Sequence, residues 1–276
     1  MYNKEAFQKI GAQEPKTVAE FHAILDKLKK DGTYTPIVLG TNDQWEAATM
    51  GFQNIGPNYW KGEDGRAALI AGKEKFTDPE YVAVLKELAT WAPYMGNGFQ
   101  AQAYPDSQNL FSLGKGAIYP AGSWDISTFR AQAKFPIGVF KPPLPEGDKD
   151  CYISDHTDIG MGLNSASKNK EDAKKFLEWL TTPEFADIFA NSLPGFFPLS
   201  KAKVTIKDDV ANTFVSWRGE CKSTIRNSYQ ILSRGTPNLE NELWNVSSQV
   251  INGSMTPDAG AKQLQTGLDK WYKPAK

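Results

Sequence analysis

Residues 113–125, LGKGAIYPAGSWD, join a short apolar segment to a polar loop that carries a tryptophan. The apolar part, Ala117–Ala121, is bounded by glycine and proline and is typical of a short strand. Gly122 and Ser123 then let the backbone turn sharply, which places Trp124 at the end of the strand. Three further segments have the same character and predict strands at Thr35–Leu39, Phe135–Phe140 and Ile159–Leu163.

Helical patterns outnumber these strands and alternate with them. Thr17 to Glu20 match a capping box, and the apolar positions that follow recur every three to four residues until Gly32. Asp78-Pro79, Thr182-Pro183 and Thr256-Pro257 are typical helix starts, with proline in the first turn. The predicted helices cover residues 17–32, 79–89, 170–180, 183–189, 239–252 and 257–271. The alternation predicts an α/β fold.

Composition excludes several classes of protein. The 31 Lys and Arg residues nearly balance the 32 Asp and Glu residues, for a net charge of −1, so we expect no nucleic-acid partner. With two histidines and two cysteines scattered along the chain, we expect no metal site and no cofactor. The signatures of P-loop, dinucleotide-binding, zincin and serine-hydrolase sites are also missing.

The two cysteines, Cys151 and Cys221, are too few for a disulfide-rich scaffold. Free cysteines behave as small buried hydrophobic residues, so two separate thiols are the simpler interpretation. A single bridge is the alternative.

Polar and aromatic residues gather in two loops that follow predicted strands. One loop holds Asp43, Gln44 and Trp45, and the other holds Gly122, Ser123 and Trp124. In open α/β sheets, ligands bind beyond the carboxyl ends of the strands. A flat indole can stack on the apolar face of a sugar ring, while carboxylates and amides bond its hydroxyls. The alternative is that both tryptophans are ordinary core residues.

At this level the chain resembles the extracellular solute-binding proteins of carbohydrate ABC importers, the family that includes maltose-binding protein. The matching segments occur in the order that the family has, and together they cover nearly the whole chain. They are Tyr2–Phe7 with Pro15–Phe21, Leu113–Ile118 with Gly122–Trp124, Asn164–Leu177 with Thr182–Glu184 and Gly195–Pro198, and finally Trp244, Val250, Gly253 and Thr256–Ala259.

The resemblance implies a type II periplasmic-binding-protein fold, in which two α/β lobes are joined by a hinge and hold a sugar between them without catalysis. Trp124 takes the place of the family's stacking tryptophan, and Trp45 or Gln44 faces the sugar. Trp244 lies near a third stacking position. Asp155 and His156 are placed at the edge of the cleft, and Arg234 lies on a loop that reaches toward it.

The family's YNK segment comes well into the chain, whereas here it begins at Tyr2. The resemblance therefore implies that a signal peptide lies upstream, that the protein is periplasmic, and that most of the N-terminal lobe is missing from this chain. Either the chain is a piece of a longer protein, or a second polypeptide supplies the missing strands. It divides the chain into a first part of the C-terminal lobe (1–142), a returning segment of the N-terminal lobe (143–200) and a last part of the C-terminal lobe (201–276). The expected partners are a carbohydrate, an ABC permease and a second chain that supplies the missing lobe.

Two other functions stay open from the sequence. One is a carbohydrate-active enzyme that uses carboxylates such as Asp43, Asp125 and Asp155. The other is a truncated lobe that works by pairing with a partner or with itself.

Overall fold

The computed structural model describes residues 1–157 and 159–274. A four-stranded sheet stands at its centre, in the order β2-β3-β1-β4. Strand β2 (Thr35–Ile37) runs parallel to β3 (Gly116–Ile118), and β1 (Tyr2–Asn3) is antiparallel to both β3 and β4 (Ile137–Gly138). Three of the four predicted strands are thereby confirmed, each shorter than expected.

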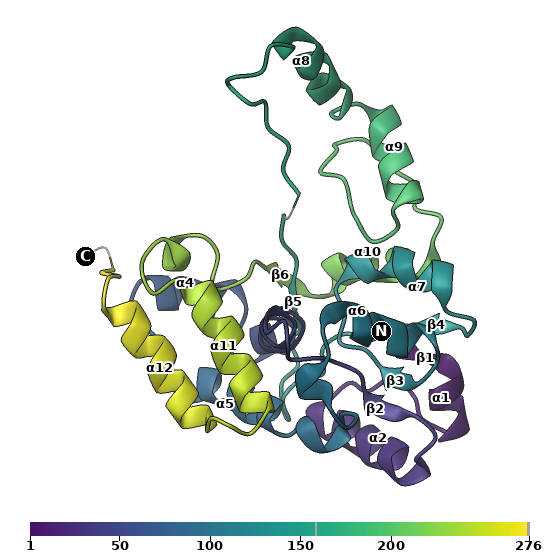
Figure 1. Ribbon diagram of the computed structural model, residues 1–276, viewed down its shortest axis with the longest axis vertical. Coiled ribbons are helices and arrows are strands. Elements are labelled where there is room, and N and C mark those ends of the chain that lie inside the picture. The colour runs from purple at the N-terminus through teal and green to yellow at the C-terminus, as the bar shows by residue number, and fades with distance from the viewer. Residues whose placement is uncertain (158, 275–276) are drawn as a thin grey trace.

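Helices lie on both sides of this sheet, with α2 (Val18–Asp31) against β2 and α6 (Tyr104–Ser112) against β3 (Figure 1). All six predicted helices are present. The capping box forms as expected, because the Thr17 side chain accepts from the Glu20 backbone and the Glu20 carboxylate accepts from the Thr17 backbone. The other helices are α1 (Lys4–Lys9), α3 (Gln53–Ile55), α4 (Glu63–Ile70), α5 (Pro79–Ala89), α7 (Ile126–Gln132), α8 (Lys170–Trp179), α9 (Pro183–Ser192), α10 (Asp209–Glu220), α11 (Leu239–Ile251) and α12 (Pro257–Asp269).

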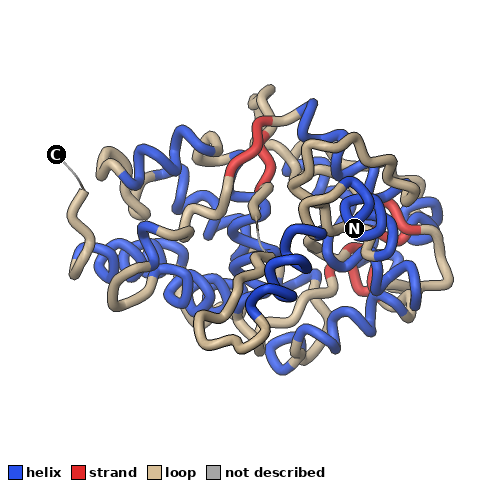
Figure 2. Tube along the Cα trace, turned by 90° about the horizontal axis from the view of Figure 1, so that it is seen from above, coloured by secondary structure: helices blue, strands red, loops and turns tan. Residues whose placement is uncertain are grey.

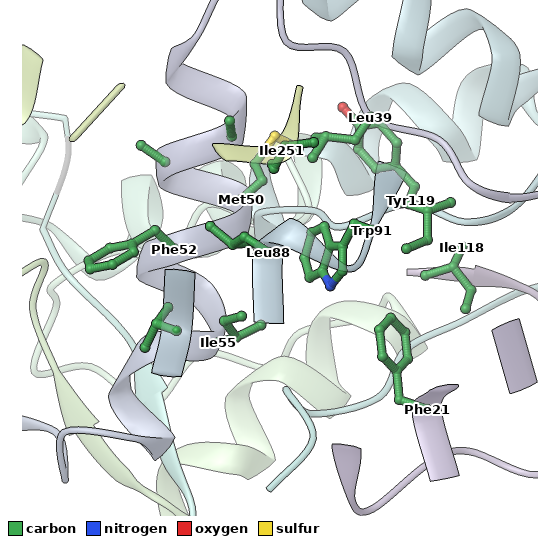
Figure 3. Close-up of a cluster of buried hydrophobic side chains, with 14 of the residues drawn as sticks. Phe21, Leu39, Met50, Phe52, Ile55, Leu88, Trp91, Ile118, Tyr119 and Ile251 are labelled. Atoms are coloured by element: carbon green, nitrogen blue, oxygen red, sulfur yellow. The ribbon is translucent and has the colours of Figure 1, made fainter. Parts of the chain in front are cut away.

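The core joins the sheet to a layer made of α5, α11, α12 and a π-helical segment, Ala47–Phe52. Figure 3 shows Met50, Leu88 and Trp91 packed between the two layers. Each of these side chains is at most 2% exposed. Burial of this apolar surface is the main term that stabilises the body of the molecule.

A second sheet of two parallel strands stands apart from the first (Figure 2). It pairs β5 (Tyr152–Ser154) with β6 (Lys222–Thr224), so the residues just before each strand, Cys151 and Cys221, come together. They form a disulfide with a Cα–Cα distance of 4.9 Å across a sequence separation of 70 residues. The prediction of two separate thiols is therefore wrong: strand pairing, which spacing in the sequence does not reveal, brings the cysteines side by side.

The predicted strand Ile159–Leu163 is also wrong. Ile159 and Met161 are 60% and 57% exposed, and the segment pairs with no strand among residues 1–157 and 159–274. A strand needs a neighbour for its backbone donors and acceptors. The strand in this part of the chain is instead the short β5, which pairs with β6.

Residues 159–205, which we call the arm, project from the body and carry α8 and α9 (Figure 1, top). The chain enters the arm after β5 and returns through α10 to β6. The tip of its returning loop contacts the body, where the Ser123 and Ser127 hydroxyls donate to the carbonyl oxygens of Gly195 and Pro194 at 2.6 and 2.9 Å. The division of the chain into three lobe segments stays a prediction.

Replacing both cysteines by serine should lower the free energy of unfolding by about 2–4 kcal/mol, because the bridge closes a long loop in the unfolded chain. Urea unfolding followed by circular dichroism measures the effect. The unmodified protein in dithiothreitol should match the double variant, and the reductant should leave that variant unchanged. Equal stability of the oxidised protein and the double variant would contradict a bridge between these residues.

Candidate functional site

A cavity with a volume of about 1210 Å³ lies where the arm meets the body. This exceeds the roughly 300–1,000 Å³ typical of small-molecule sites and leaves room for a ligand of several rings. The body contributes the loop after β3, the end of β5 and one face of α10, while the arm contributes mostly apolar side chains. Those of the arm include Leu177, Leu180, Phe185, Phe189, Phe196 and Phe197.

The loop after β3 brings Gly122, Ser123 and Trp124 into the cavity wall, as one group of predicted site residues. A Cβ on Gly122 would lie 2.0 Å from the Trp124 ring, so only glycine leaves room for the indole in this position. Gly195 of the arm makes a similar close approach, with φ at +104° and a Cβ position 1.9 Å from the Ser123 carbonyl oxygen. The indole is half-buried and one side of it faces the cavity.

Asp155 and His156 follow β5 and lie in the same cavity wall. The Asp155 carboxylate accepts two hydrogen bonds from Arg218 of α10, at 2.7 and 2.8 Å. The His156 ring stands edge-on to Tyr229, with ring centroids 5.5 Å apart. Arg218, which the sequence did not single out, therefore fixes one predicted site residue and reaches the cavity itself.

The loop of Asp43, Gln44 and Trp45 lies next to the cavity wall without lining it. Tyr104 connects the two: its backbone N–H donates to Asp43 Oδ2 at 2.8 Å, and its ring stands edge-on to Trp45, with centroids 4.8 Å apart. The Trp124 indole in turn donates to the Tyr104 hydroxyl at 2.9 Å. Two loops that the sequence treats separately thus form one cluster through a residue that was not predicted.

Gln44, Arg234 and Trp244 are not part of the cavity lining. Gln44 is exposed on its loop, with φ at +60°. Arg234 is exposed on a loop whose neighbouring Gly235 packs against the Trp271 indole beyond α12. Trp244 is half-buried on α11 and packs against the core.

Two buried carboxyl groups lie behind the tryptophan cluster. Glu46 and Asp125 are both 0% exposed. Burial raises the pKa of Glu46 to about 8, with a further contribution from the negative charge of Asp43. The Glu46 carboxyl accepts no well-formed hydrogen bond from the described residues.

Burial likewise raises the pKa of Asp125, to about 6, against the opposing effect of hydrogen bonds from Tyr104 and Gln108. Of the three carboxylates considered for catalysis from the sequence, only Asp155 lines the cavity. Its ion pair with Arg218 occupies both of its oxygens. No group of three or more metal-ligating side chains occurs within residues 1–157 and 159–274. In the same ranges, every helix is too short or too polar to span a bilayer.

The chain is similar in sequence to known solute-binding proteins. A family model described as bacterial extracellular solute-binding protein matches residues 1–187. A relative from Mesorhizobium japonicum, named "Probable sugar-binding periplasmic protein", is 28% identical over 225 residues, covering 76% of this chain and 48% of the relative. An ABC transporter extracellular-binding protein of Pyrococcus horikoshii is 29% identical over 126 residues, which is 45% of this chain and 29% of that protein. The matched part of the chain thus spans about half the length of the first relative and less than a third of the second.

Solved structures share the fold. A chitin oligosaccharide binding protein superimposes with a TM-score of 0.85 at 22% identity, over 98% of this chain and 68% of that one. At such low identity the likeness concerns the fold, which is that of type II periplasmic solute-binding proteins, as the sequence predicts. The matching family and relatives are solute-binding proteins and not enzymes.

Glu46→Gln should change how stability depends on pH. Because the folded protein binds the Glu46 proton more tightly than the unfolded chain, this residue's contribution to stability falls as pH rises from about 4.5 to about 8. A glutamine at this position does not titrate, so the variant does not lose stability in this way as pH rises. The variant should therefore gain more than about 1.4 kcal/mol relative to the unmodified protein between pH 5 and 8.

Urea unfolding at a series of pH values measures this difference. Glu5→Gln is the matched control, since it makes the same substitution at an exposed position away from the buried carboxyl groups. A flat difference for Glu46→Gln as well would show that Glu46 is ionised in the folded protein at neutral pH.

Proposed function

This chain belongs to the bacterial extracellular solute-binding protein family, and on that premise we propose that it binds a sugar or oligosaccharide in the cavity between the arm and the body. The observation that carries the proposal is the half-buried Trp124 indole in the cavity wall, which lies close against Gly122. An aromatic plate with polar groups around it suits a ring that has an apolar face and hydroxyls at its rim.

Polar groups that could bond sugar hydroxyls lie around this plate. Ser123, Asp155 and His156 line the cavity beside Trp124, and Arg218 lines it from α10. We propose Asp43, Gln44 and Trp45 as an adjoining region for a longer ligand, because Tyr104 connects them to Trp124. Arg234 and Trp244 stay in the proposed set on the family resemblance alone.

We propose that binding involves closure of the arm side of the cavity onto the body, without catalysis, and that an ABC permease recognises the closed form. The arm contacts the body through the loop after α9, with two serine hydrogen bonds, and is continuous with the body at β5 and α10, an arrangement that suits hinge motion. The disulfide supports an extracytoplasmic location, since disulfides persist mainly in oxidising compartments.

We further propose that a second polypeptide covers part of the arm. Phe176, Ile188 and Leu199 are 50%, 45% and 84% exposed there, and contiguous exposed apolar surface is typical of interaction sites. A light-scattering mass above that of one chain would support this. It should fall with Leu199→Ser and stay unchanged with Leu113→Ser, whose side chain is 72% exposed on the body. A clean monomer would contradict it.

Trp124→Ala should weaken sugar binding by about 2 kcal/mol or more, as expected for a central aromatic in a binding site. Isothermal titration calorimetry with chitobiose, raffinose, xylotriose and maltotriose would identify a ligand and measure the loss. Trp179→Ala is the matched control, because it removes a partly exposed indole of α8 that does not line the cavity. Unchanged affinity in Trp124→Ala would exclude the stacking role, and failure of all four sugars would count against a carbohydrate ligand.

A further inference from the structure

The Trp124 indole is held from behind by a short series of hydrogen bonds. Its Nε1 donates to the Tyr104 hydroxyl oxygen at 2.9 Å, and the Tyr104 hydroxyl donates to Asp125 Oδ1. Gln108 Nε2 donates to the same carboxylate oxygen at 2.8 Å. Neither Tyr104 nor Asp125 belongs to the cavity lining, so neither is placed to touch a ligand there.

The direction of these hydrogen bonds is fixed by chemistry. An indole N–H can only donate, and a tyrosine hydroxyl has a single proton. To accept from Trp124, the Tyr104 oxygen must direct that proton elsewhere, and Asp125 is the acceptor within reach. Burial and the charge of Asp125 raise the pKa of Tyr104, so the hydroxyl keeps its proton.

Burial also makes the arrangement costly to break. Asp125 is 0% exposed, so water cannot replace a lost partner. Hydrogen bonds in series polarise one another, which strengthens the bond at the indole when Tyr104 donates to a carboxylate. Tyr104 is itself fixed from a second loop, through the bond from its backbone to Asp43 and the contact of its ring with Trp45.

We propose that Tyr104 and Asp125 are positioning residues that set the orientation of the Trp124 indole in the cavity wall, and through it the affinity for the sugar ring. This proposal rests on the proposed function, because it takes Trp124 as the stacking surface. It adds that the orientation of the indole, and not only its presence, determines affinity.

Tyr104→Phe tests the first part without any ligand. The variant keeps the ring against Trp45 and removes only the hydroxyl. The eight tryptophans give separate indole N–H signals in a 1H–15N NMR spectrum, and Trp124→Phe identifies the signal of Trp124. In Tyr104→Phe that signal should shift upfield and exchange faster with water, while the indole signals remote from the cluster stay in place.

Affinity for the best sugar of the calorimetric panel tests the second part. Tyr104→Phe should weaken binding by about three- to tenfold, the range expected for one hydrogen bond. Tyr94→Phe is the matched control, since the Tyr94 hydroxyl also donates to an aspartate, Asp26, at 2.7 Å but lies outside the cavity. It should change neither the Trp124 signal nor the affinity.

Two substitutions at Asp125 test whether its side chain acts as a hydrogen-bond acceptor or only fills space. Asp125→Asn keeps an oxygen for the Tyr104 hydroxyl and should retain most of the signal position and affinity. Asp125→Leu has a similar volume but no acceptor and should resemble Tyr104→Phe, with thermal unfolding used to check that it folds. If it does not fold, the comparison of Tyr104→Phe with Asp125→Asn decides the question.

An unmoved Trp124 signal in Tyr104→Phe would overturn the positioning role. A moved signal with unchanged affinity would overturn the link from orientation to binding. Equal losses in Asp125→Asn and Tyr104→Phe would show that Asp125 does not act as an acceptor. If no sugar binds the unmodified protein, the proposed function and the claim on affinity both fail, while the indole signal still decides whether Tyr104 holds Trp124.

Discussion

The parallel pairing of β5 with β6, closed by the Cys151–Cys221 disulfide, is the constraint on which the rest of the structure depends. The arm leaves the body at this place and the chain returns to it after α10. Because the two connections are fixed side by side, the arm can face only one part of the body, namely the loop after β3. The cavity, with aromatic residues of the arm on one side and Trp124 on the other, follows from that placement.

The polar residues behind the cavity hold the Trp124 side chain in place at the end of its loop. Gly122 provides the space for the indole, and the hydrogen bond from the indole N–H to the Tyr104 hydroxyl sets the direction in which the indole points. The unfavourable part is the burial of Glu46 and Asp125, whose raised pKa values report the loss of hydration. Buried carboxyl groups of this kind commonly occur where function restricts the choice of residue.

Local signals in the sequence were sufficient for the helices, because caps such as Thr17 with Glu20, and proline in the first turn, act within a few residues. The strand before Trp124 was predicted for the same reason. Strand β5 was missed, since three residues are too few for a pattern and its partner lies about 70 positions away. The disulfide depends on that same pairing and could not be predicted either. The role of Tyr104 depends on contacts with residues 20, 21 and 61 positions away, which no motif joins.

The contact between the loop after α9 and the body has an energetic consequence. The hydrogen bonds from Ser123 to Gly195 and from Ser127 to Pro194 are both neutral, and a neutral hydrogen bond contributes about 1 kcal/mol net. The two together contribute about 2 kcal/mol, beside the packing of Phe197 of the arm against the core and under Arg218. A ligand that bridges the two walls adds its own contacts to these, so it favours the closed arrangement by the difference between its affinities for the closed and open states.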